Sequence, residues 1–123
     1  MKTAPESELA SYIGAVLVRY VDLPDTPIRY SPTDLALARK LHQEGVPLPL
    51  VESAFLLASL RRLTRPAAFP PLPRIRSLAY FMPVIAELQQ QPLPSGYLDY
   101  LRLKLATVAA RPDDQKTTFS DDR

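Results

Sequence analysis

The sequence of 123 residues contains no cysteine, a single histidine and only three glycines. Without cysteine the chain can form no disulfide, no thiolate zinc site and no cysteine nucleophile. Three isolated glycines are too few for a glycine-rich phosphate-binding loop. We interpret His42 as a partly exposed helix residue, because no clustered ligands accompany it. We therefore expect no metal, no cofactor, no small-molecule substrate and no catalytic residue, which means that the protein is not an enzyme.

Long apolar runs are missing as well. No stretch of the sequence has the length needed to cross a bilayer. The first six residues lack the apolar core of a signal peptide. We therefore expect a soluble, cytoplasmic protein that does not contact a membrane. The net charge of +2 is too small to indicate a partner by itself.

Proline, in contrast, is abundant, and its fourteen residues divide the chain into stretches of helical length. Within each stretch apolar side chains recur every three or four residues, as on one face of a helix, and no stretch shows the period-two alternation of a strand. Helices are predicted at about 5–21, from Ser31-Pro32 to Gly45, and at about 47–63, 77–90 and 97–110. The sequence thus predicts an all-α fold, a compact bundle of about five helices with proline-rich connectors. Residues 1–111 form a single helical domain in this prediction, and residues 112–123 form a disordered polar tail.

Several features refine this helical prediction. Ser31 is suited to cap the second helix and Gly45 to end it. The almost wholly apolar stretch 51–60 indicates that the third helix is the central, buried one. The proline-rich segment 66–73 favours a stiff, extended connection. Pro83 lies inside the fourth apolar stretch, where it either kinks the helix or marks the first turn of its main part.

The charges are unevenly distributed along the chain. Between positions 61 and 76 there is no acidic residue but there are five arginines, namely Arg61, Arg62, Arg65, Arg74 and Arg76. Arginines in such a segment are suited to neutralise phosphates, and the nearby Tyr80 and Phe69 are suited to stack or pack. The alternative interpretation is that the arginines cap helix carbonyls and keep an apolar helix soluble.

A helix-turn-helix is a second way to interpret residues 35–55, which contain a helix, a glycine turn and another helix. The would-be recognition helix begins with Pro47-Leu48-Pro49-Leu50, which offers no donor to base edges. An ordinary helical hairpin accounts for the same residues.

Two parts of the chain, residues 41–60 and 75–88, resemble the C-terminal domain of DnaD-like replication-initiation and phage replisome-organiser proteins. The resemblance rests on a glycine, Gly45, that ends one helix before an apolar helix, and on a later helix in which a tyrosine is followed by aliphatic residues at matching spacing. These matching residues are Tyr80, Val84, Ile85 and Leu88. The resemblance implies a helical module that contacts DNA and other replication proteins, with Tyr80 in the DNA-contacting region; Arg74 and Arg76 are added from their charge alone.

These observations favour a non-enzymatic, DNA-associated accessory protein of replication or of a mobile element. The predicted nucleic-acid-binding residues are Arg61, Arg62, Arg65, Arg74, Arg76 and Tyr80. The alternative is a module for protein–protein interaction or assembly without affinity for nucleic acid, because surplus apolar surface in a domain of this size favours another protein or a second copy as partner.

Overall fold

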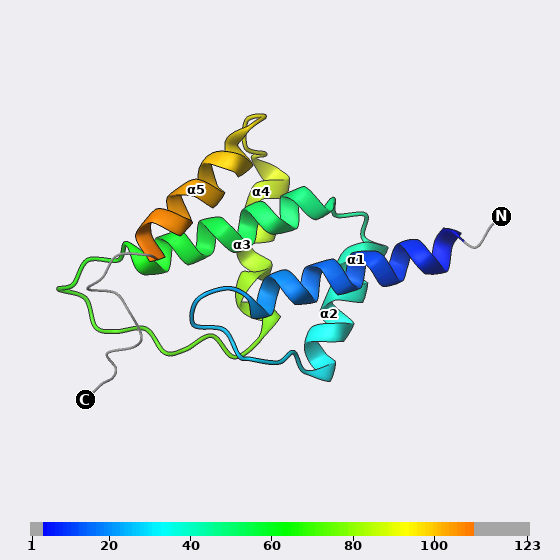
Figure 1. The fold of residues 1–123 in the computed structure, drawn as a ribbon, viewed down its shortest axis with the longest axis horizontal. Coiled ribbons are helices and arrows are strands. Elements are labelled where there is room, and N and C mark those ends of the chain that lie inside the picture. The colour runs from blue at the N-terminus through cyan, green and yellow to red at the C-terminus, as the bar shows by residue number, and fades with distance from the viewer. Residues whose placement is uncertain (1–3, 110–123) are drawn as a thin grey trace.

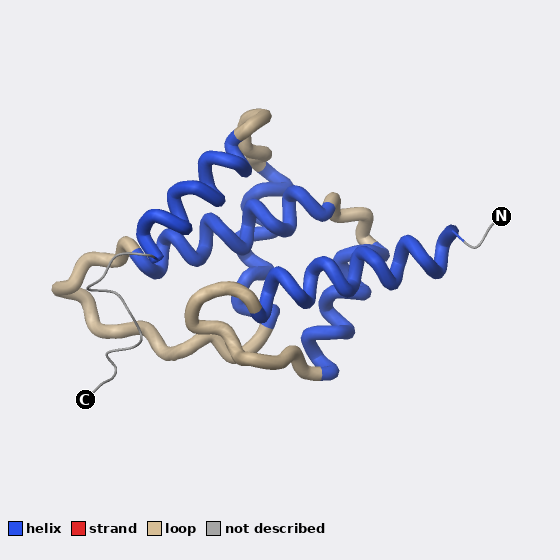
Figure 2. Tube along the Cα trace, viewed as in Figure 1, coloured by secondary structure: helices blue, strands red, loops and turns tan. Residues whose placement is uncertain are grey.

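The computed structural model describes residues 4–109, and these form helices and loops without any strand (Figures 1 and 2). The elements are α1 (Ala4–Val21), α2 (Pro32–Gln43), α3 (Leu48–Leu63), the short 3₁₀ helix η1 (Leu78–Phe81), α4 (Met82–Gln90) and α5 (Tyr97–Ala109). The predicted all-α bundle of about five helices is confirmed. The tail predicted at 112–123 lies outside the described residues.

The helix boundaries follow the local chemistry of the sequence. Ser31 and Asp34 form a reciprocal cap at the start of α2: the Asp34 amide donates to Ser31 Oγ over 3.2 Å, and the Ser31 amide donates to Asp34 Oδ2 over 2.9 Å. Gly45, with a φ of +72°, turns the chain after α2. Pro83 lies in the first turn of α4, where its missing amide hydrogen is not needed, so it starts this helix and does not kink it.

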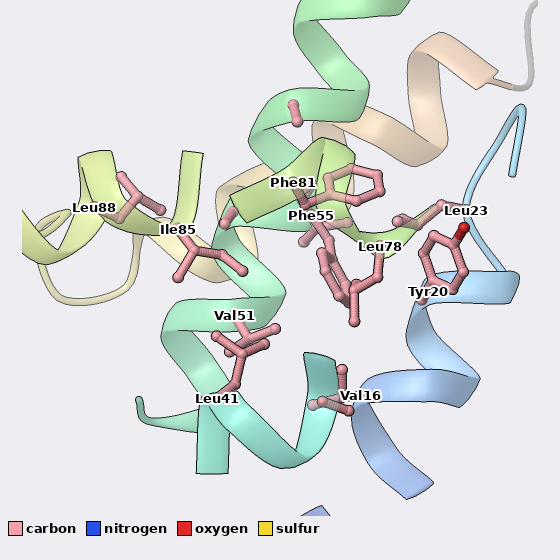
Figure 3. Close-up of a cluster of buried hydrophobic side chains, with 14 of the residues drawn as sticks. Val16, Tyr20, Leu23, Leu41, Val51, Phe55, Leu78, Phe81, Ile85 and Leu88 are labelled. Carbon is pink, nitrogen blue, oxygen red and sulfur yellow. The ribbon is translucent and has the colours of Figure 1, made fainter. Parts of the chain in front are cut away.

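Helix α3 is the centre of the bundle, as predicted. It contacts α1, η1, α4 and α5, whereas α2 packs on α1 and η1. Aromatic rings fill the space between these elements (Figure 3). The Phe55 ring on α3 lies 5.0 Å from that of Phe81 and 6.4 Å from that of Tyr20, between ring centroids. Such tilted and edge-to-face pairs are favourable beyond the area that they bury.

A single buried carboxylate joins two distant parts of the chain. Asp34 is 1% exposed, and its Oδ1 accepts a 2.8 Å hydrogen bond from the Leu78 amide at the start of η1. Since its other oxygen caps α2, Asp34 accepts hydrogen bonds from backbone amides at the starts of both α2 and η1. Burial, together with the Asp34 charge, raises the pKa of the neighbouring Tyr20 to about 12.

Helix α5 is attached to α3 by an ion-pair network on the surface. Arg102 donates to both carboxylate oxygens of Glu52 over 2.9 and 3.0 Å, and Arg19 of α1 lies 3.4 Å from the same carboxylate. The hydrogen bond from Arg102 holds the pKa of Glu52 below its usual range. Apolar residues of α5 are only partly covered, because Leu101 is buried whereas Leu103 is exposed.

The chain between α3 and η1, residues 64–77, is called the connector below. In Figure 1 it leaves the end of α3 and returns beneath the helices beside the loop between α1 and α2. Ile75 anchors it there: its side chain is buried, and its amide donates to the Asp25 carbonyl over 3.1 Å. Among the described residues, no helix combines the length and apolar character required to pass through a membrane.

Candidate nucleic-acid interface

Arg61 faces α4, away from the connector. Its two terminal nitrogens donate to the two carboxylate oxygens of Glu87 over 2.9 and 2.7 Å, a bidentate pair in which both side chains are about half exposed. The hydrogen bond from Arg61 lowers the pKa of Glu87. A phosphate would have to compete with this carboxylate for the Arg61 guanidinium.

Arg62 is almost covered, with a side chain only 8% exposed. It donates to the Asp25 carboxylate over 3.1 Å, to the Pro73 carbonyl over 2.9 Å and to the Tyr80 hydroxyl over 3.3 Å. Its guanidinium carbon also lies 5.3 Å from the centre of the Tyr80 ring. Arg62 therefore holds together α3, the α1–α2 loop, the connector and η1.

Arg65 lies at the start of the connector, just after α3, and packs on residues later in the connector. Its guanidinium carbon lies 4.9 Å from the centre of the Phe69 ring, and its Nε donates to the Pro70 carbonyl over 3.4 Å. The arginines were expected, in one interpretation, to cap the carbonyls of their own helix. Arg62 and Arg65 instead bind carbonyls of the connector, which is an extended chain with few backbone partners of its own.

Arg74 and Arg76 are arranged differently. Both side chains are exposed, on either side of the buried Ile75. Within the described part of the chain neither forms an ion pair. Since the side chain between them points into the core, both arginines project outward from one anchored point.

Tyr80 is 41% exposed on η1, although Arg62 covers part of its ring and Phe81 packs against its edge. The six residues predicted from the sequence thus do not form one continuous ridge. Arg61 lies on the α4 side, while the other five surround the connector. We call the group Arg65, Phe69, Arg74, Arg76 and Tyr80 the connector face.

A hollow of about 390 Å³ lies between the end of α3, the first half of the connector and the α1–α2 loop. Its walls include the charged residues Asp25, Arg62 and Arg65 and the ring of Phe69. Asp25 was not among the residues predicted from the sequence. It lies 37 positions before Arg62, and only the tertiary structure brings the two together.

A second candidate surface is an apolar groove of about 470 Å³ between α1 and α2. Leu9, Ile13 and Leu17 line it, and Gly14 leaves open space there, because apart from its chain neighbours and the nearby backbone of its own helix no atom lies within 4 Å of the place that a Cβ would occupy. Tyr30 and Val18 border this groove and are exposed.

His42 is half-buried and packs edge-on against Tyr12, with 5.0 Å between the ring centres. The Tyr12 hydroxyl donates to the Val46 carbonyl over 2.6 Å, and burial raises the pKa of Tyr12 to about 12. His42 thus packs where the helical pattern placed it, at the contact between α1 and α2.

Comparisons with models of known protein families, with curated proteins and with solved structures found no match. The resemblance to DnaD-like proteins therefore stays a prediction.

Proposed function

We propose that the protein binds nucleic acid through the connector face. The observation that carries this proposal is the outward projection of Arg74 and Arg76 from the anchored Ile75, with no acidic partner among the described residues. Arginine is suited to phosphate oxygens because its planar guanidinium donates two parallel hydrogen bonds. Exposed cations without acidic partners gain the most from a polyanion, since no internal ion pair must be broken.

The surroundings of these two arginines fit the same ligand. Phe69 and Tyr80 are each partly exposed and are each backed by an arginine, at 4.9 and 5.3 Å from the ring centres. Basic residues interleaved with aromatic rings are typical of proteins that bind single strands, whose bases stack on such rings. Because Ile75 and the prolines restrict the connector, less conformational entropy is lost when a ligand binds.

The biological setting proposed for this binding is that of an accessory protein of replication or of a mobile element. The resemblance of residues 41–60 and 75–88 to DnaD-like proteins supports this setting, and Tyr80 belongs to both the resemblance and the connector face. Neighbouring genes that encode replication or transposition proteins would agree with it. Neighbours of unrelated function would argue against it.

The test is a titration of labelled mixed-sequence DNA, followed by fluorescence anisotropy. For about three neutralised phosphates, binding should weaken on the order of twentyfold when salt rises from about 50 to about 200 mM. The double variant Arg74→Glu, Arg76→Glu should weaken binding at low salt at least about tenfold. The matched control is Arg39→Glu, Lys104→Glu, which changes two exposed cations on α2 and α5 by the same total charge. Undetectable binding at low salt, or equal losses in both double variants, would refute the proposal.

The groove between α1 and α2 favours a second candidate function, assembly of the protein with a second copy of itself. Val18, which is 65% exposed, borders the groove in which Gly14 leaves open space, and Ile28 in the loop between α1 and α2 is 90% exposed. A protrusion and a recess on one surface are what a two-fold dimer needs, because each copy can insert its protrusion into the recess of the other. Covering these side chains also removes apolar surface from water.

Light scattering across a range of concentrations tests the assembly. Gly14→Leu fills the recess, so it should abolish the dimer, while the better helix propensity should stabilise the monomer by about 0.5–1 kcal/mol. Ala86→Leu, at an exposed position of α4, is the control and should leave the dimer intact. A wild-type protein that remains monomeric at high concentration would remove this candidate.

A further inference from the structure

We infer that the connector hollow is a subsite for one unpaired nucleobase of a single-stranded nucleic acid, an inference that rests on the nucleic-acid binding proposed above. The hollow, of about 390 Å³, is lined by Arg65 of the connector face and by Arg62, and it is large enough for a base with part of its sugar. Its lining combines an aromatic ring, apolar prolines, two leucines, two arginines and a carboxylate. This is the mixture that holds a base by stacking and orients it by hydrogen bonds.

Phe69 supplies the stacking surface. Its side chain is 52% exposed although the Arg65 guanidinium covers part of the ring. The guanidinium fixes the orientation of Phe69, so the remaining surface of the ring is available in one position.

Asp25 supplies the polar recognition. Its Oδ2 accepts the hydrogen bond from Arg62, and no other hydrogen bond to this carboxylate occurs within the described residues. The Asp25 side chain is about half exposed, so Oδ1 can accept a hydrogen bond from a ligand. An acidic acceptor fits the amino groups of cytosine, adenine and guanine. Thymine and uracil carry no amino group, and their one ring N–H donor lies between two carbonyl oxygens that repel a carboxylate.

Hydrogen bonds to the connector help to hold the hollow in shape. The carbonyls of Pro70 and Pro73 are tied to Arg65 and Arg62, respectively. Each proline of the connector also has a φ angle that is fixed by its ring. The connector therefore does not need to reorganise around a base, which reduces the entropy lost on binding.

The same arrangement disfavours a duplex as the ligand. A base can enter the hollow only when it leaves its stack, which costs a few kcal/mol in a duplex and much less in a single strand. The basic residues also lie on an extended chain and do not line a helix of the kind that enters a major groove. Arg74 and Arg76 lie just beyond the hollow in the chain, where phosphates next to the bound base would be placed.

The experiment compares labelled strands of about 15 nucleotides, a usual site size for such proteins. The probes are oligo(dC), oligo(dT), a sugar–phosphate strand without bases, and a duplex, each titrated with the full chain at low salt. The wild-type protein should bind oligo(dC) about tenfold more tightly than the strand without bases, as one stacked base allows. Oligo(dT) should bind more weakly than oligo(dC), and the duplex should bind more weakly than either.

Two variants test whether Phe69 and Asp25 provide the stacking and the base preference. Phe69→Leu should reduce the affinity for oligo(dC) to within about twofold of that for the strand without bases. Tyr100→Leu, which removes an exposed ring on α5, is the matched control and should leave the affinity unchanged. Asp25→Asn should remove the preference for oligo(dC) over oligo(dT). Asparagine is chosen because Asp25 has a φ of +66°, which asparagine adopts more readily than most residues, and the urea midpoint checks that the fold is retained.

The outcomes separate this inference from the proposed function. If the strand without bases binds as tightly as oligo(dC), and Arg74→Glu with Arg76→Glu weakens both, the base subsite is refuted while nucleic-acid binding stands. Equal binding of duplex and single strand, or an unchanged affinity in Phe69→Leu, would also refute the subsite. If no strand is retained at low salt, the function and the subsite both fail.

Discussion

The two halves of the arginine-rich segment differ in whether their arginine side chains are bound within the protein. Arg61, Arg62 and Arg65, which we call the structural arginines, are bound to Glu87, to Asp25 and Pro73, and to Phe69 and Pro70. Arg74 and Arg76, the open arginines, have no acidic partner in the described residues. Charge alone therefore does not identify a binding site. An arginine can strengthen the binding of a partner only to the extent that it is not already paired within the protein.

The placement of the open arginines depends on the half of the segment that precedes them. Two of the structural arginines, Arg62 and Arg65, bind the connector through its carbonyls, while Ile75 inserts between the open arginines. The position of the open arginines is thus set by contacts that they do not make themselves. Variants in each half should separate folding from binding.

The largest expected effect on stability follows from removing the anchor. Ile75→Ala should lower the free energy of unfolding by about 2–4 kcal/mol, because it leaves a cavity under the connector. Urea denaturation measures this loss, and Ile75→Val should lose only about 1 kcal/mol. If Ile75→Ala were as stable as the wild type, the connector would not be anchored at this residue.

Arg62→Ala should lower the free energy of unfolding by about 2 kcal/mol, because the Pro73 carbonyl and the Asp25 carboxylate lose a charged donor. Asp25 remains partly hydrated, so the loss should stay below that of a fully buried pair. Arg61→Ala, whose pair with Glu87 is exposed, should shift the urea midpoint less than Arg62→Ala does. Equal midpoints for the two variants would contradict the distinct burial of Arg61 and Arg62.

A pH titration extends the comparison to Glu52, which holds Arg102 and Arg19. Hydrogen bonding from Arg102 lowers the pKa of Glu52 below its ordinary value of 4.5, so the unfolded chain binds a proton more readily than the folded one. The resulting stability is present above pH 4.5 and is lost as the pH falls through the lower pKa of the folded state. Thermal unfolding should show a smaller acid-induced loss for Glu52→Gln than for the wild type. Parallel profiles would show that this carboxylate does not contribute.

The smallest effect on stability is expected for the open arginines. Arg74→Ala and Arg76→Ala should each change the free energy of unfolding by less than about 0.5 kcal/mol, because neither side chain has a partner to lose. Each should nevertheless reduce the slope of log affinity against log salt by about 0.7 for a single strand. A loss of stability comparable to that of Arg62→Ala would place them among the structural arginines.

Most of the fold was predictable because its signals are local. The proline positions, the Ser31 cap and Gly45 fix where helices begin and end within a turn or two of the chain. The choice between a kink and a start at Pro83 was not local. It depends on η1, which opens before α4 begins and whose first amide, that of Leu78, is held by Asp34, 44 positions earlier in the chain.

The candidate site was less predictable because it depends on pairing across the chain. Arg62 meets a carboxylate 37 positions away, and Arg61 one 26 positions away, so sequence alone could not separate them from Arg74 and Arg76. The alternation around Ile75, an apolar residue between two arginines, is the local signal that would have singled out the open arginines.

The carboxylate of Asp34 has a consequence for how the molecule tolerates change. It holds the Leu78 amide, and the Asp25 carbonyl holds the Ile75 amide, so residues 75–78 are fastened to the region around α2 independently of the chain before them. Insertions between Pro66 and Pro71 would remove the contacts of Arg65 with Phe69 and Pro70 and would add loop-closure entropy of about 0.6 kcal/mol for each doubling of loop length, but they would leave residues 75–78 in place. The tip of the connector is therefore a place where new sequence can be grafted or diversified without shifting the register of the helices that follow.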